Sequence, residues 1–455
     1  MNIRLLLLTL LMPVFAAAQF LAPDTPLQQA YIQATQQDKL IFLMIESADC
    51  QQCNDVVDKA LQNDTLKNFI SNNFIAIRLT AEHPDLNFLK EKYNTVDGNS
   101  VLFLDKFGTL ISRLNMSTTD YKRYITQCKY ALNRKTEADG LRALEFDALT
   151  GKLTTDNIFD LMYKRKTLAL PVDALLDQYV KQLPADSLNS FSTIQRIVRL
   201  SPILRSKADS VVRKNAQLYN AVWSSFTPTE QVSINKDIIF KTRLKAAQEK
   251  NVAKGKEVAQ YARLSYTDKE AGEKSYAYNM MEFFRGIKDT AAFLKSAVDY
   301  YERFQKNLNA ADIKKQDSAR LAALSKMHRN ARPVKDTTIN GKLISRTVST
   351  FRYSPKANYY SQVLNNGARS FYNMTKDPIF LKKALQWAAN ANEFYESPYV
   401  LDTYARLLYK VDKKNADQAI QLEEKAITLL KTQGGPTNKH NEVLNKMKQK
   451  TATLD

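Results

Sequence analysis

The chain has 455 residues, more than one hydrophobic core accommodates, so we expect two to four domains. Its formal net charge is +19, and it contains 11 glycines and three histidines. Scarce glycine argues against Gly-rich phosphate loops, and neither G-x-x-x-x-G-K-[ST] nor G-x-G-x-x-G occurs. Three histidines leave little for hydrolytic triads or zinc catalysis, so we expect no cofactor and no metal.

The first 18 residues have the pattern of a secretory signal peptide. One arginine near the start precedes a short apolar run and then Ala16-Ala17-Ala18, a small-residue cleavage site. The apolar run is shorter than the roughly 20 residues that a membrane-spanning helix needs. We therefore expect an exported, periplasmic protein, cleaved after Ala18, with no integral membrane segment. In that compartment a disulfide persists, and the positive charge favours a lysine-rich solvated surface over a nucleic-acid partner.

Residues 19–136 are predicted to form an α/β domain. Asp24-Thr25-Pro26 marks a helix start, because a capping side chain precedes a proline. Six apolar residues at 40–45 predict a strand that is buried on both faces. A helix follows the first two cysteines, and Asp64 is expected to cap the next one. The later predicted elements are a strand at 74–79, a helix at 86–93, strands at 101–104 and 109–114, and a helix at 118–134.

The chain has three cysteines, Cys50, Cys53 and Cys128, so one thiol is left over. The first two lie three positions apart at a predicted helix start, where unpaired N–H groups and a partial positive charge stabilise a thiolate. A redox pair, a structural disulfide and half of a metal site are the alternatives. Structural zinc usually needs a second such pair, and the sequence has none. Cys128 lies on an apolar helix face, which favours a buried core thiol.

The element order, the Cys-x-x-Cys position and the segment VLFLDKFGTLI resemble the thioredoxin-like superfamily over roughly residues 25–135. The resemblance implies an α/β fold and thiol–disulfide exchange on a protein substrate. It also implies Cys50 as the attacking cysteine, Cys53 as the resolving cysteine, and a redox partner protein that supplies or accepts electrons.

The sequence departs from the thioredoxin pattern at several positions. The place of a buried aspartate is held by Met44, and the place of the cis-proline is held by Asn99, followed by Ser100 in the substrate loop. The acidic Asp49 and Glu46 would raise the cysteine pKa. These departures keep a second interpretation open: a non-catalytic interaction protein whose thioredoxin fold is a docking module and whose cysteine pair is a structural disulfide.

Residues 137–270 are predicted to be helical, without a clear repeat. The predicted helices include 173–182, 190–199, 203–222 and 236–262.

A repeat occupies residues 271–436. The segment 283–304 matches 371–394 at an offset of 87 or 88 residues, with two aromatics, Lys-Asp and then Phe-Leu-Lys-x-Ala. A finer period of 35 to 37 residues, with small residues where helices would touch, resembles tetratricopeptide repeats. The sequence thus predicts a larger all-α, tetratricopeptide-like region, with a helical tail at 437–455. We expect a concave surface for a protein or peptide partner, and a helical scaffold without a partner is the alternative.

A basic insertion at 327–357 interrupts the repeats. From Lys326 to Lys356 there are eight Lys/Arg and one acid. A loop of this length inside a helical array is uncommon and often functional. A docking segment for an acidic partner is one interpretation, and a solvated insertion is the other. The expected partner contacts are Arg329, Arg332, Arg346, Phe351, Arg352 and Tyr353.

Overall fold

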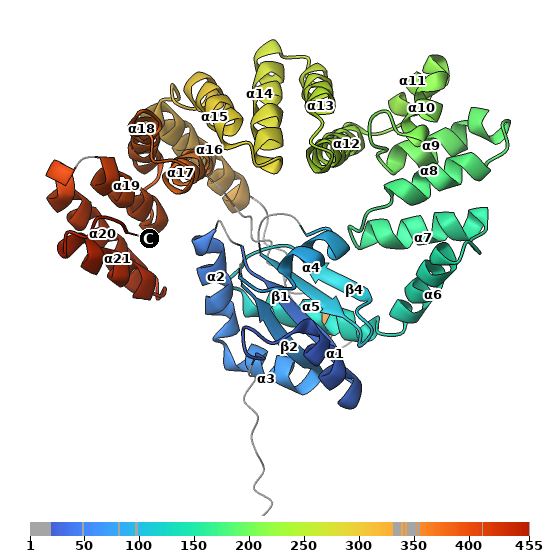
Figure 1. Ribbon diagram of the computed structural model, residues 1–455, viewed down its shortest axis with the longest axis horizontal. Helices are drawn as coiled ribbons and strands as arrows, with labels where there is room; N and C mark the ends of the chain where they lie inside the picture. Colours follow the sequence, from blue (N-terminus) through green and yellow to red (C-terminus); the bar gives the residue numbers. More distant parts are fainter. Residues whose placement is uncertain are drawn as a thin grey trace, which may run out of the picture. The chain divides into compact units, whose positions relative to one another are not determined.

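A computed structural model describes residues 20–47, 50–80, 82–95, 99–330, 338–339, 342–343, 353, 355–411 and 413–454. The chain packs as two compact units, Met1–Pro228 and Thr229–Asp455. The first runs from blue to green in Figure 1 and the second from green to red. Within the described ranges, no helix is both long and apolar enough to cross a membrane. The expected signal peptide lies outside the described residues.

The first unit begins with a four-stranded sheet. Its strands are β1 (Leu40–Ile45), β2 (Phe74–Leu79), β3 (Ser100–Leu104) and β4 (Leu110–Leu114), in the order β2-β1-β3-β4. β1 pairs parallel with β2 and antiparallel with β3, and β3 pairs antiparallel with β4. All six residues of β1 are buried, because helices cover both faces of this central strand.

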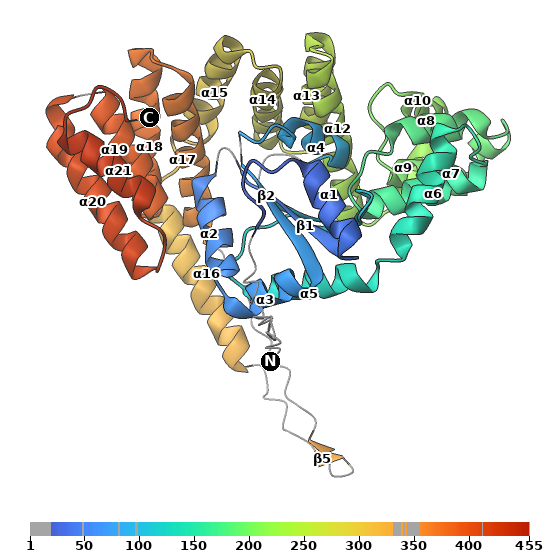
Figure 2. The same ribbon diagram turned by 60° about the horizontal axis from the view of Figure 1, so that its bottom comes forward.

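Alternate residues of β1 enter two different cores. Phe42 and its neighbours at even positions pack with α2 (Gln51–Leu61), α3 (Asp64–Asn73) and α5 (Tyr121–Asn133). The odd positions pack with α1 (Leu27–Gln36) and α4 (Leu86–Tyr93). In Figure 2, α3 and α5 lie side by side, in agreement with their direct contact.

The predicted α/β elements are confirmed, most of them to within one or two residues. The capping residue of α3 was predicted wrongly. Asn63, not Asp64, precedes the helix, and its Oδ1 accepts a hydrogen bond from Leu66 N at 3.3 Å. Asp64 instead occupies the first helical position, where its negative charge still favours the helix N-terminus.

The remainder of the first unit is helical. The prediction of a single helix at 203–222 is wrong, because two helices, α10 (Lys207–Lys214) and α11 (Ala216–Ser224), occupy most of that range. Asn215 lies between them in an extended conformation, and its Oδ1 accepts a hydrogen bond from Leu218 N at 3.0 Å. The elements are α6 (Glu137–Leu149), α7 (Thr155–Thr167), α8 (Asp173–Gln182), η1 (Ser187–Asn189), α9 (Phe191–Arg199), α10 (Lys207–Lys214) and α11 (Ala216–Ser224).

The second unit is a stack of helices. The predicted helix at 236–262 is also two helices, because Asn251 caps the second of them through Lys254 N at 3.0 Å. The elements are α12 (Pro228–Gln248), α13 (Val252–Leu264), α14 (Lys269–Gly286), α15 (Thr290–Phe304), α16 (Ala310–Asn330), β5 (Thr338–Ile339), β6 (Lys342–Leu343), α17 (Lys356–Met374), α18 (Pro378–Phe394), α19 (Pro398–Val411), η2 (Lys413–Asn415), α20 (Ala416–Thr432) and α21 (Asn438–Lys448).

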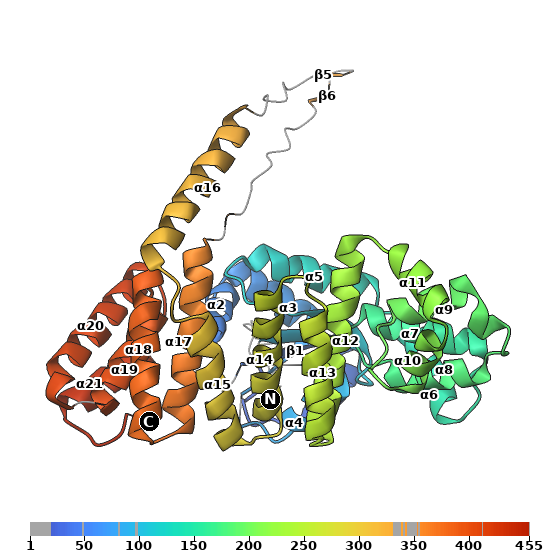
Figure 3. The same cartoon turned by 90° about the horizontal axis from the view of Figure 1, so that it is seen from above.

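The helices pack in the manner of helical repeats. Figure 3 shows α13, α14, α15, α17, α18 and α19 side by side in this order, and each of these helices contacts the next one in the series. The matching segments found in the sequence both place an aspartate before a helix: Asp289 Oδ1 accepts a hydrogen bond from Ala292 N before α15, and Asp377 Oδ1 accepts one from Ile379 N before α18. The alanines expected at the helix contacts are fully buried, namely Ala384, Ala391, Ala419 and Ala426.

Candidate functional site

The cysteine pair lies at the start of α2. Cys50 and Cys53 form a disulfide with a Cα–Cα distance of 5.2 Å. Cys50 is the residue before the first helical position, and its Sγ accepts a hydrogen bond from Cys53 N at 3.2 Å. Both cysteines are partly exposed. The disulfide is therefore placed where another thiol or disulfide can approach it.

The helix start also determines what reduction of this disulfide would produce. A Cys50 thiolate would face the Cys53 N–H group and the positive end of the α2 dipole. Both interactions lower a thiol pKa and so increase the fraction of nucleophilic thiolate at neutral pH. The local structure thus suits the attacking role that the thioredoxin resemblance implies for Cys50.

Arg78 pairs with two carboxylates beside the cysteines. Glu46, in the loop before Cys50, is paired with Arg78 of β2, and Arg78 Nη1 lies 2.8 Å from Asp58 Oδ1 on α2. Although burial lowers the pKa of Arg78, its two carboxylate partners outweigh this and raise it. Glu46 is therefore not an isolated charge next to the cysteines, as its sequence position had suggested. Asp49 lies outside the described residues.

The strand behind the cysteines carries no carboxylate at the expected place. Met44 is fully buried and lies opposite Arg78 in the β1–β2 register. This agrees with the sequence alignment on the cysteines, which puts Met44 where thioredoxins bury an aspartate. Proton transfer to or from the cysteines would therefore involve solvent or another group.

Asn99 and Ser100, the residues of the predicted substrate loop, lie beside the segment that leads to the cysteines. Asn99 Oδ1 accepts a hydrogen bond from Ser47 N at 2.7 Å, and Ser100 pairs with Ile45 in the sheet. Ser100 Oγ donates to Asn115 Oδ1 at 3.0 Å. The residue before Asn99 lies outside the described ranges.

Cys128 and His83 have structural roles in this domain. Cys128 is fully buried on α5, and burial raises its pKa to about 12, so the expected core thiol is confirmed. His83 Nδ1 accepts a hydrogen bond from Asp85 N, which leaves Nε2 to donate to Thr25 O at 3.0 Å. Both ring nitrogens of His83 are thus used within the fold.

A cavity of about 480 Å³ lies elsewhere in the first unit. It is formed between α4, the β3–β4 turn and helices α6 to α8, and its walls are mostly apolar. None of the described residues between 46 and 58 lines it, so it is distinct from the described part of the cysteine site. Representative lining residues are Tyr93, Leu110, Leu141, Leu149, Leu161 and Leu170.

Of the six residues expected to contact a partner, only Tyr353 has a described side chain. Its hydroxyl donates to Asp317 of α16, with Asp317 Oδ1 at 2.8 Å. The same carboxylate accepts hydrogen bonds from Lys356 N and Ala357 N and thereby caps α17. Tyr353 thus fixes the end of the insertion to the helical stack, and the partner-binding role stays a prediction.

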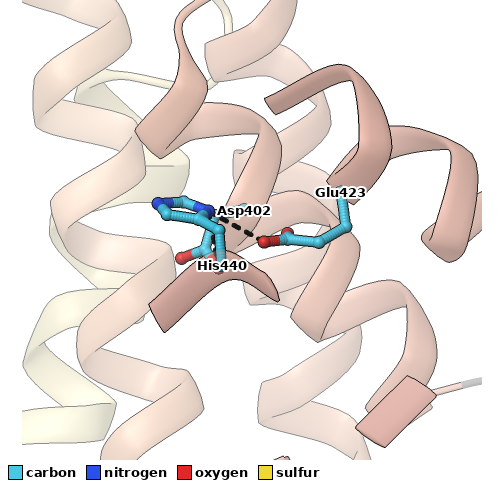
Figure 4. Close-up of side chains that lie close together, drawn as sticks. All are labelled: Asp402, Glu423 and His440. Atoms are coloured by element: carbon cyan, nitrogen blue, oxygen red, sulfur yellow. Dashed lines mark hydrogen bonds and ion pairs between the residues drawn. The ribbon is translucent and has the colours of Figure 1, made fainter. Parts of the chain in front are cut away.

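A second cluster of titratable groups lies among the last helices. Asp402 of α19, Glu423 of α20 and His440 of α21 are all buried, and Figure 4 shows the His440 imidazole facing the Glu423 carboxylate. His440 Nδ1 lies 2.8 Å from Glu423 Oε1. The cluster is not evident from the sequence, because its members are far apart along the chain and belong to three different helices.

The three side chains have ligand atoms within 4.8 Å of one another, an arrangement that can hold a metal ion. Two guanidinium groups form ion pairs with the Asp402 carboxylate: Arg369 Nη1 lies 2.8 Å from Oδ2, and Arg406 Nε lies 2.6 Å from Oδ1. They balance the two carboxylates, so a divalent cation would add uncompensated positive charge to a buried site. The geometry favours an ion-pair network that joins α19, α20 and α21.

This network predicts a pH dependence of stability. Burial lowers the pKa of His440, but the Glu423 hydrogen bond and the Asp402 carboxylate outweigh burial and raise it above 6.5, while Arg406 opposes them. A raised histidine pKa stabilises the fold below pH 6.5, and this contribution is lost as pH rises through the folded-state pKa. Burial also raises the pKa of Glu423 above its ordinary value of 4.5. The stability that protonated Glu423 contributes to the fold is therefore lost as pH rises from about 4.5 through its folded-state pKa.

We expect amide hydrogen exchange in α19–α21 to become faster, relative to intrinsic exchange, as pH rises from 6 to 8. His440→Gln keeps a donor for Glu423 but does not titrate, so the pH dependence of its protection should be weaker than that of the wild type, and only the contribution of Glu423 should remain. Equal pH dependence in the two proteins would contradict the assignment to His440.

The comparison with protein families agrees with this geometry. Residues 23–104 match a family model described as thioredoxin-like. This range contains the cysteine pair, α1 to α4 and the first three strands. No curated protein matches the chain. The N-terminal domain is therefore thioredoxin-like, and it is followed by a large all-helical region.

Proposed function

We propose that the thioredoxin-like domain performs thiol–disulfide exchange on a protein substrate, with Cys50 as nucleophile and Cys53 as the resolving cysteine. The observation that carries this proposal is the partly exposed Cys50–Cys53 disulfide at the start of α2. A helix N-terminus is where a cysteine thiolate is stabilised.

The proposed reaction has two steps. The Cys50 thiolate attacks one sulfur of a substrate disulfide, which forms a mixed disulfide and releases the other substrate sulfur as a thiolate. The Cys53 thiolate then attacks Cys50 Sγ, which forms the Cys50–Cys53 disulfide and releases the second substrate thiolate. The substrate gains two electrons and the cysteine pair loses two, and a dithiol partner protein must return them. The same steps in reverse oxidise a dithiol substrate.

The regions outside the thioredoxin-like domain have proposed roles in substrate binding and export. We propose that the helical region holds the protein or peptide substrate, and that the basic insertion contributes to binding an acidic partner. We further propose that residues 1–18 direct export to the periplasm and are then removed. The all-helical repeat arrangement supports the first statement, since such stacks commonly present binding surfaces.

The proposal is tested by a redox titration of the full mature chain. The protein is equilibrated in dithiol–disulfide buffers, free thiols are trapped by alkylation, and their number is counted by mass. Exchange proteins titrate between roughly −270 and −120 mV. We expect rapid, reversible titration of two thiols in that window, abolished by Cys50→Ser and unchanged by Cys128→Ser.

The alternative predicts a different titration. A pair that stays oxidised below roughly −300 mV, or that exchanges only over hours, would behave as a structural disulfide. That result would overturn the exchange proposal and favour an interaction protein whose thioredoxin fold is a docking module. The replacement of the expected cis-proline by Asn99 is the observation that favours this second function.

A further inference from the structure

Two buried asparagines hold the segment that leads from β1 to the cysteines. Ser47 N donates to Asn99 Oδ1 at 2.7 Å and is also within 3.1 Å of Asn54 Oδ1. Asn54 Nδ2 donates back to Ser47 O at 3.0 Å. Each of the three residues is 7% exposed. The backbone N–H and C=O of Ser47 are thus both bound by side chains rather than by water.

These side chains come from two directions. Asn54 follows Cys53 on the first turn of α2, whereas Asn99 directly precedes β3, the strand next to β1. Ser47 lies three residues before Cys50. The hydrogen bonds therefore connect the chain before Cys50, the helix turn after Cys53 and the neighbouring strand.

The burial of this arrangement makes it costly to break. A buried N–H group without a partner destabilises the fold, because water cannot replace the lost hydrogen bond. Asn99 Nδ2 is buried and has no hydrogen-bond partner in the part of the chain that the structure describes. What this side chain contributes to the site is therefore its carbonyl oxygen, which a proline at the same place would lack.

We infer that Asn54 and Asn99 are positioning residues that keep Cys50 opposite Cys53 after reduction, and so favour re-formation of the disulfide. This inference rests on the proposed function. A loop held at Ser47 keeps the two thiols near the 5.2 Å Cα–Cα separation of the disulfide, which gives them a high effective concentration. Without the hydrogen bonds, the segment before Cys50 samples other positions, and the disulfide becomes easier to reduce.

The test measures the equilibrium constant between the cysteine pair and a glutathione buffer in the full mature chain. We expect Asn54→Ala and Asn99→Ala each to lower the constant for disulfide formation about tenfold, which corresponds to a potential about 30 mV less negative. The double variant should exceed the sum of the single effects, because each single variant leaves the other asparagine as acceptor for the Ser47 N–H group and only the double variant removes both acceptors.

Two further variants control for folding. Asn63→Ala removes the cap of α3 in the same domain without touching Ser47, so it should lower stability and leave the equilibrium constant unchanged. Asn99→Leu removes the carbonyl oxygen and the unpartnered amide together at similar volume, so it should fold well and shift the constant as Asn99→Ala does.

The outcomes separate the two claims. A wild-type pair that does not titrate would refute the proposed function. If the wild type titrates, and the folded Asn54→Ala and Asn99→Leu variants have the same equilibrium constant for disulfide formation as the wild type, only the positioning inference is overturned. A shift of the same size in Asn63→Ala would also overturn it, because the effect would then follow general stability.

Discussion

Replacement of Cys53 by serine is expected to stop exchange after its first step and to leave the substrate bound to Cys50. The Cys50 thiolate still attacks a disulfide from the helix start, but no second thiolate remains to release the product. Turnover of a disulfide-bonded peptide should fall by on the order of 1,000-fold or more, because the resolving nucleophile is lost. A mixed disulfide should accumulate and be visible by mass and on a non-reducing gel.

Cys50→Ser is the matched comparison for this experiment. It removes the attacking thiolate, so neither turnover nor a mixed disulfide is expected. Cys128→Ser should behave as wild type, since that thiol is buried away from the pair. A stable adduct on Cys53 in the Cys50→Ser protein would reverse the assigned roles of the two cysteines.

Replacement of Asp402 by asparagine is expected to destabilise the second unit by about 3–5 kcal/mol. Although burial raises its pKa, the charges of Arg406 and Arg369 lower it overall, so the carboxylate is ionised. Its loss leaves two guanidinium groups without their buried counter-charge, and removing one partner of a buried ion pair has a cost of this size. Hydrogen exchange of α19–α21 measures the lost protection in the full chain.

Asp299→Asn provides the surface comparison. Asp299 pairs with Arg303 one turn away on α15, and both side chains are about half exposed. Such a pair contributes at most about 1 kcal/mol, because water screens it. Similar losses of protection in the Asp299 and Asp402 variants would show that the buried network contributes no more than an ordinary surface pair.

The α/β domain could be predicted because its signals are local. β1 is an unbroken apolar run, and the helix after the cysteines has a clear apolar face, so each element is specified by consecutive residues. The small errors have local causes too. Asn215 and Asn251 each cap a new helix directly or shortly after the previous one ends, and a helical apolar period that continues through them conceals the break.

The parts of the site that the sequence did not predict depend on residues that are distant in the chain. Ser47 and Asn99 are 52 residues apart, and only the pairing of β1 with β3 brings them together. The network around Asp402 joins three helices in the same way. Periodicity reports which face of an element is buried, but it does not report which polar groups meet there.

The burial of Cys128 has a practical use in cells. A thiol with a pKa of about 12 and no exposed surface does not react with a polymer-linked maleimide while the protein is folded. Native labelling would therefore add two tags to the reduced protein and none to the disulfide form. If the pair exchanges as proposed, the ratio of the two gel bands would report the fraction of the cysteine pair that is reduced.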